Sequence, residues 1–237
     1  MPLNLLIVAF AAISAISTAS AATIYSDSLF GAGPLNSSTV DSSAAFAGGT
    51  SGATWTAAAS INQTTTGAAL PDNTMAFLPI TITAGNIYTL QATMTNIGAG
   101  WGALGFSNSS ATDGAWHTTN IKYAWGLLRP EGDLGNNQFF AGGGTDNGAA
   151  WASADRGTKT MTLDTTNAFW STYASINGAN SDTFTYTTNP VDITHVGFGV
   201  QFATSEVSNF SLTAVPEPSV ALLGGLGLMA LLRRRRA

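Results

Sequence analysis

The stretch that decides the fold is Ile87-Tyr88-Thr89-Leu90-Gln91-Ala92-Thr93-Met94-Thr95-Asn96-Ile97. Its apolar residues, which include Tyr88, Leu90 and Met94, alternate with threonine and glutamine. A period of two places one set of side chains in a core and the other in water. The stretch therefore predicts a β-strand with one buried face.

The same alternation recurs on both sides of this strand. It appears at residues 78–82, 160–163, 183–186, 196–203 and 210–213. Asn177-Gly178, between residues 170–176 and 182–187, predicts a hairpin. About ten to twelve short strands with frequent turns are typical of a sandwich or jelly roll. We therefore predict an all-β, two-sheet antiparallel β-sandwich in which residues 196–203 place small side chains on the second face of a sheet, as a concave or stacked surface.

The composition excludes several other classes of protein. The 237 residues include no cysteine, 45% are hydrophobic and only 9% are charged, where ordinary proteins carry about 25% charged residues. The hydrophobic content excludes intrinsic disorder, and the lack of cysteine excludes disulfides and thiolate metal sites. Glutamate occurs only at positions 131, 206 and 217, and lysine only at 122 and 159, which disfavours a helical bundle.

The charges are distributed unevenly along the chain. Four of the eight basic residues are Arg233, Arg234, Arg235 and Arg236. Since Glu217 is the one acid of the same tail, the preceding region carries a formal charge of about −8. Nucleic-acid binding needs clustered basic residues to neutralise phosphates. No nucleic-acid partner is therefore expected.

The N-terminus reads as an export signal. Residues 3–16 are apolar, and Ala19 and Ala21 satisfy the small-residue rule for cleavage by signal peptidase after Ala21 or Ala22. The alternative is a buried N-terminal helix. We expect residues 1–22 to be a signal peptide, and residues 23–214 to form a single β-sandwich domain.

The C-terminus reads as a short membrane segment. Val215-Pro216-Glu217-Pro218-Ser219 precedes an uncharged run to Leu232, which the four arginines close. Residues 219–232 form about 21 Å of helix, short of a hydrocarbon core about 30 Å thick. The arginines would stay in the cytoplasm and the β-domain outside. We expect a transient stop in the inner membrane.

These C-terminal features together resemble the PEP-CTERM sorting signal of Gram-negative bacteria that make exopolysaccharide. The resemblance covers residues 215–237. It implies that an exosortase recognises Pro216, Glu217 and Pro218 while the arginines hold the chain in the membrane. The protein would then be released or transferred to the cell surface or extracellular matrix, as the substrate of that reaction and not its enzyme.

The region before the tail resembles the domains that often precede such signals, which are concanavalin-type (laminin G-like) jelly rolls. The resemblance rests on residues 31–36, 52–55, 196–199 and 207–212. It implies the same two-sheet architecture that the strand periodicity predicts.

No pattern of catalytic residues stands out. Glycoside hydrolysis needs two carboxyl groups facing each other across a cleft, but the domain holds only Glu131 and Glu206, and Glu131 shares a turn with Asp133. His117 and His195 belong to no recognisable nucleophile or zinc motif. We expect no catalytic residue and no catalytic metal.

The loop-rich centre suggests two kinds of binding. Some of its side chains carry oxygen atoms that could bind calcium; they are Asp133, Asn136, Asn137, Asp146 and Asn147. Their spacing is not that of a calcium-binding loop, and tight turns explain the same residues equally well. Its tryptophans suit the C–H face of a sugar ring, with core packing as the alternative; they are Trp101, Trp116, Trp125 and Trp151.

The sequence predicts an exported, non-enzymatic surface or matrix protein that contacts extracellular polysaccharide. Two alternatives remain open. One is a secreted glycan-active hydrolase or lyase with an atypical site. The other is a structural matrix component that binds no glycan.

Overall fold

A computed structural model describes residues 20–95, 100–114, 124–128, 138–141, 157–202 and 204–217. In this part of the chain the regular structure consists of seventeen β-strands. Ala21–Val215 forms one compact unit. None of the described residues belongs to a helix of the length and apolarity that crossing a bilayer requires. The predicted signal helix and C-terminal membrane helix lie outside the described residues, apart from their junctions with the β-domain.

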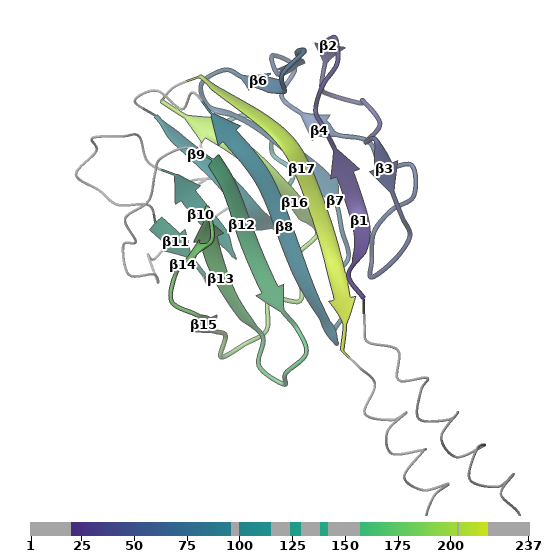
Figure 1. Cartoon of the computed structure of the whole chain (residues 1–237), viewed down its shortest axis with the longest axis vertical. Coiled ribbons are helices and arrows are strands. Elements are labelled where there is room, and N and C mark those ends of the chain that lie inside the picture. The colour runs from purple at the N-terminus through teal and green to yellow at the C-terminus, as the bar shows by residue number, and fades with distance from the viewer. Residues whose placement is uncertain are drawn as a thin grey trace, which may run out of the picture. The chain divides into compact units, whose positions relative to one another are not determined.

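The larger of two sheets has eleven strands (Figure 1). Its main path runs β14-β13-β12-β8-β17-β6-β5-β2, and β1, β3 and β15 pair beside it. The long strands are β8 (Asn86–Thr95), β12 (Gly157–Asp164), β13 (Ser171–Ile176), β17 (Ser205–Pro216) and β1 (Ala22–Asp27). The short ones are β2 (Gly33–Pro34), β3 (Ser42–Ser43), β5 (Asn62–Gln63), β6 (Ala68–Leu70), β14 (Ala179–Asn180) and β15 (Phe184–Thr185).

The smaller sheet has six strands in the order β11-β10-β9-β16-β7-β4. They are β11 (Gln138–Phe140), β10 (Trp125–Leu128), β9 (Trp101–Ser107), β16 (His195–Gln201), β7 (Thr74–Pro79) and β4 (Thr56–Ala57). The strand pairs of both sheets are antiparallel, as in β12 with β8 and β16 with β9. The predicted all-β, two-sheet antiparallel sandwich is therefore confirmed.

The main core lies between the two sheets. Tyr88, Leu90, Ala92 and Met94 of β8 are fully buried in it, while the intervening residues face outward. The smaller sheet contributes residues such as Phe198 of β16 to the same core. The alternation that predicted a strand at residues 87–97 thus also identified the buried face.

The structure corrects two details of the predicted strands. Residues 78–82 do not form a strand of their own: β7 begins at Thr74 and ends at Pro79. Ile80 still donates to the Thr194 carbonyl, but Thr81 donates to the Gly48 carbonyl instead of continuing beside β16. The hairpin turn falls at Asn177-Gly178 as predicted, with φ angles of 48° and 87°. Its return strand, however, is β14, which begins at Ala179 immediately after the turn and not at residue 182.

The first and last strands of the domain are hydrogen-bonded neighbours. Ala22 of β1 lies opposite Ala214 of β17, and the pairing continues to Asp27 and Phe210. The pairing shifts register between Thr23 and Tyr25. Both ends of the domain therefore leave from the same strand pair.

Candidate functional site

An open pocket of about 500 Å³ lies on the outer face of the larger sheet. Four neighbouring strands, β1, β17, β8 and β12, contribute to it. Gln91 and Thr93 point outward from β8, in alternation with its buried residues, and Thr158 of β12 pairs directly with Thr93. Ser26 and Ser211 supply further hydroxyls from the paired strands β1 and β17. We call this site the polar pocket.

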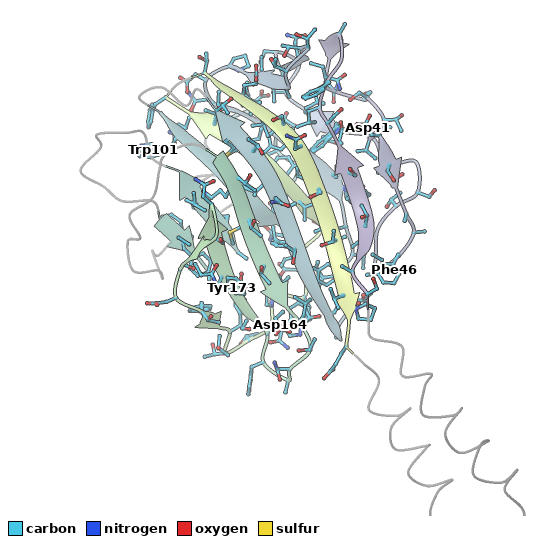
Figure 2. All side chains as sticks on the ribbon, in the orientation of Figure 1. Asp41, Phe46, Trp101, Asp164 and Tyr173 are labelled. Atoms are coloured by element: carbon cyan, nitrogen blue, oxygen red, sulfur yellow. The ribbon has the colours of Figure 1, made fainter. Side chains whose placement is uncertain are left out.

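Two aspartates form the upper rim of the polar pocket. Asp41 accepts hydrogen bonds at Oδ2 from the Ser28 backbone N–H and from the Ser28 hydroxyl, both at 2.8 Å. Asp27 accepts at Oδ1 from the Leu29 N–H and at Oδ2 from the Trp55 indole N–H, both at 2.7 Å. Pairing of β1 with β3 brings the two acids into one pocket, and Figure 2 shows Asp41 beside β3.

The two carboxyl groups are not equivalent. Burial raises the pKa of Asp27, its hydrogen bonds from Trp55 and Leu29 oppose that rise, and the charge of Asp41 adds to it. Both Asp27 oxygens are engaged within the protein, so this acid fixes the turn and the indole. Asp41 is exposed, and its Oδ1 accepts no hydrogen bond from the described residues. Asp41 is therefore the carboxylate that a ligand hydroxyl can reach.

Asn209 lies at the same rim of the pocket, beside Ser28. It has a φ of 52°, a left-handed conformation that asparagine tolerates, and its N–H donates to the Ser28 carbonyl at 3.3 Å. Its side chain is exposed at the pocket. The rim thus offers an amide as well as hydroxyl and carboxylate groups.

The described lining residues include no lysine, arginine or histidine. Lys159 follows the lining residue Thr158 but turns inward and is fully buried. Its Nζ has no hydrogen-bond partner among the described residues, and burial holds the pKa of this amine well below its usual range. The described lining of the pocket therefore offers no cation to an anionic ligand.

The polar pocket was not foreseen from the sequence. Asp27 and Asp41 stand in separate turn-like segments, which the β1–β3 pairing and the hydrogen bonds from Ser28 to Asp41 bring together. An Asp-Ser pair occurs at both places, at Asp27-Ser28 and at Asp41-Ser42. That local pattern predicts a side-chain-capped turn but gives no sign that the two turns meet.

Two of the four candidate tryptophans lie in the described residues, and they share one cluster. Trp125 is fully buried with Met75, Phe77 and Ala103 on the outer face of the smaller sheet, and Trp101 packs beside them. The Trp125 ring stacks on Phe140 at a centroid distance of 4.1 Å. Trp101 is only partly buried and is the more accessible of the two. Trp116 and Trp151 lie outside the described residues.

The other candidate residues are dispersed. His195 opens β16 as predicted, and burial lowers its pKa. Glu206 on β17 accepts a hydrogen bond from the Thr66 hydroxyl at 2.8 Å. Glu131 and His117 lie outside the described residues, as do the five calcium candidates Asp133, Asn136, Asn137, Asp146 and Asn147. Within the described segments, no group of three or more acidic or histidine residues is placed to hold a metal ion.

The sorting triplet begins where the sheet ends. Pro216 is the last residue of β17 and Glu217 is exposed. Pro218 and Arg233, Arg234, Arg235 and Arg236 lie outside the described residues.

Comparison with known proteins yields similar folds only. Neither a family model nor a curated protein matches the sequence. An endo-1,3-β-glucanase from Streptomyces sioyaensis gives a TM-score of 0.47 at 13% identity, over 83% of this chain and 97% of the other. A GalNAc complex of a Bauhinia forficata lectin gives 0.44 at 8% identity, over 69% and 93%. The carbohydrate binding module CBM66 from Bacillus subtilis gives 0.41 at 17% identity, over 67% and 94%. Likenesses this distant assign neither a ligand nor an activity to the chain.

Proposed function

We propose that this protein is an exported, non-enzymatic surface or matrix component that binds extracellular polysaccharide at the polar pocket. The proposal includes a jelly-roll sandwich of the concanavalin (laminin G-like) type. The observation that carries the proposal is the composition of the pocket. An open hollow lined by hydroxyl, amide and carboxylate groups, without a cation, suits a neutral ligand rich in hydroxyls.

The hydrogen-bonding groups of the pocket match what a sugar offers. Gln91 and Asn209 can both donate and accept, and Asp41 accepts through an oxygen that the protein leaves free. Hydrogen bonds to a charged group contribute about 1.5–3 kcal/mol, more than neutral ones. A hydroxyl bound to Asp41 would therefore be the strongest single contact.

The same geometry argues against hydrolysis at this pocket. A glycosidase needs one carboxylic acid that can donate a proton and a second carboxylate across the bond. Asp27 has both oxygens occupied by Leu29 and Trp55. Asp41 alone cannot fill both roles, so binding is the function that the pocket supports best.

Glycan binding is tested by changing outward side chains that do not reach the core. In the double variant Gln91→Ala/Thr93→Val, we expect affinity for neutral polysaccharides to fall about tenfold, as expected for the loss of one or two hydrogen bonds. The full chain, purified in mild detergent, is measured by affinity electrophoresis in gels that contain β-glucan, mannan or dextran.

Thr185→Ala is the matched control, since this exposed residue lies on the edge strand β15 and outside the pocket. Wild-type binding to neither neutral nor acidic polysaccharides would contradict the proposal and favour the structural alternative. Equal binding by the double variant and the wild type would remove the polar pocket as the site.

The export route is part of the same proposal. Signal peptidase would remove residues 1–22, and an exosortase would act at Pro216, Glu217 and Pro218 while Arg233 to Arg236 hold the chain in the inner membrane of a Gram-negative cell. Support comes from the order of these features in the sequence, together with the exposure of Glu217 directly after β17.

Deletion of Arg233 to Arg236, or the change Glu217→Gln, is expected to leave an unprocessed or mislocalised precursor. Cell fractionation with mass spectrometry of the C-terminus measures the outcome. Glu206→Gln, at the acid within β17, should be processed normally. A mature protein of normal size in the medium after both tail changes would exclude sorting by this signal.

A further inference from the structure

Phe202 is held in a backbone conformation that does not suit it. The residue directly follows β16 and has a φ of 63°, in the left-handed region that bulky side chains avoid. Leu29 shares this conformation, with a φ of 64°, but its side chain is fully buried in the core. Phe202 is instead 59% exposed. Burial therefore compensates the strain at Leu29 but not at Phe202.

The surrounding residues fix the Phe202 ring in place. The Phe202 backbone N–H donates to Asp72 Oδ1. The Phe202 ring meets the Trp101 ring edge-on, with 5.2 Å between centroids and an interplanar angle of 87°. Figure 2 shows Trp101 on the opposite side of the view from Asp41 of the polar pocket. The protein thus maintains an aromatic pair at its surface, away from that pocket.

A polar atom beside the pair is left without a partner. Gln201 lies directly opposite Trp101 in the β16–β9 pairing, so the two side chains share one face of the smaller sheet. The Oε1 of Gln201 is buried and accepts no hydrogen bond from the described residues. An unpaired buried acceptor is unfavourable, and rotation of the partly buried Gln201 side chain toward a bound ligand would let this oxygen accept a hydrogen bond.

We propose that Phe202, Trp101 and Gln201 form a second glycan-binding site, the Phe202 platform. The C–H face of a pyranose ring packs on the aromatic rings, and a hydroxyl of the same sugar donates to Gln201 Oε1 once this side chain has rotated outward. An exposed ring next to an unpaired acceptor matches a sugar, which is apolar on its face and rich in donors at its rim. The platform shares its ligand class with the proposed function but none of its residues.

Substitution by glycine separates a functional ring from a structural one. Glycine adopts a positive φ without strain, so Phe202→Gly should leave the melting temperature unchanged or raise it by about 2–5 °C. Affinity for the polysaccharide that wild type binds should nevertheless fall at least fivefold. Phe202→Trp should keep the affinity. Phe169→Ala is the matched control, because Phe169 is also 59% exposed and should not affect binding.

The assay uses the full chain in gels that contain β-glucan, mannan or dextran, with zwitterionic lipid vesicles as a separate probe. Unchanged affinity in Phe202→Gly overturns the platform. A melting temperature more than about 5 °C lower overturns it too, since the ring would then be structural. If Phe202 is required for binding to vesicles but not for binding to polysaccharide, the ring is a lipid-binding group. That result also overturns the platform.

The variants distinguish a wrong assignment of the platform from a wrong assignment of the polar pocket. If Gln91→Ala/Thr93→Val loses affinity while Phe202→Gly keeps it, the platform is wrong and the pocket stands. If only Phe202→Gly loses affinity, the platform stands and the pocket is wrong. If wild type binds none of the polysaccharides, both are wrong.

Discussion

Lys159 belongs to β12, where it stands in phase with Met161 and Leu163 and shares their buried face. A methyl group placed at Gly126 of β10 would lie 2.9 Å from Lys159 Cε and 3.4 Å from Nζ. The amine therefore reaches across the core to a strand of the other sheet. Its pKa lies well below the usual range because burial disfavours the charged form.

Lys159→Met is expected to stabilise the protein by roughly 1–3 kcal/mol at pH 7, because it removes an unpaired buried amine. In the unfolded wild-type chain, the Lys159 amine binds a proton at pH values below about 10.4. In the folded chain, the buried amine binds that proton much more weakly. The stability of the wild type therefore rises from neutral pH toward that value, and the advantage of methionine shrinks. Urea unfolding at pH 7 and pH 10 measures both effects.

Thr160→Met is the matched control for this change, since residue 160 of the same strand points away from the core. It should show no such dependence on pH. A Lys159→Met protein that is less stable than wild type at both pH values would mean that the amine has a stabilising partner.

The sequence contained the sign that Lys159 is buried, because it replaces an apolar residue in the alternation of Thr158 to Leu163. The role of Asp27 could not be predicted in the same way. Its partner Trp55 is far along the chain, and the contact depends on how several short strands pack. Periodicity reports the face of a residue within one strand, whereas a pocket depends on which strands become neighbours.

At the level of elements, β16 shows how small residues are used in the smaller sheet. The sequence predicted small residues on the second face of residues 196–203, and Gly197 and Gly199 lie there as buried residues. The space above them is not empty. A methyl group at Gly197 would meet the Phe77 ring at 2.8 Å, and one at Gly199 would meet Met75 Cγ at 2.6 Å. Side chains of β7 therefore lie across the glycines of β16.

Gly197→Ala should destabilise the protein by roughly 1–3 kcal/mol, the usual effect of overpacking. The added methyl would lie 2.1 Å from the Ala76 carbonyl oxygen, which belongs to the paired strand and cannot turn away. Thermal unfolding measures the loss. Gly178→Asn is the control, since nothing lies near that position and asparagine accepts its φ of 87°. A Gly197→Ala protein that melts like wild type would show that β7 and β16 can separate locally.

The length of an element decides whether the sequence reveals it. β8 alternates over ten residues and was predicted in full, whereas the alternation of β17 is interrupted at Asn209 and only its residues 210–213 were predicted. β2, β3, β4 and β5 contain two residues each, and a pair of residues has no period. These short strands account for most of the excess over the expected ten to twelve strands.

At the level of the whole molecule, polar groups lie on the outer face of the larger sheet and apolar residues fill the core between the sheets. The larger sheet uses hydroxyl and amide groups for its outer face at the polar pocket, and the one described lysine lies inside. Since the chain contains no cysteine, no disulfide supports the sandwich. Its stability rests on the core between the sheets, to which both sheets contribute fully buried residues.

The pairing of Ala22 with Ala214 also determines when the domain can finish folding. β17 lies between β8 and β1 in the larger sheet, so this sheet stays divided until the last strand has been synthesised. Contacts between such distant parts of a chain form slowly, because a long loop must close first. The domain can therefore complete its larger sheet only once the chain is available through the end of β17, at Pro216.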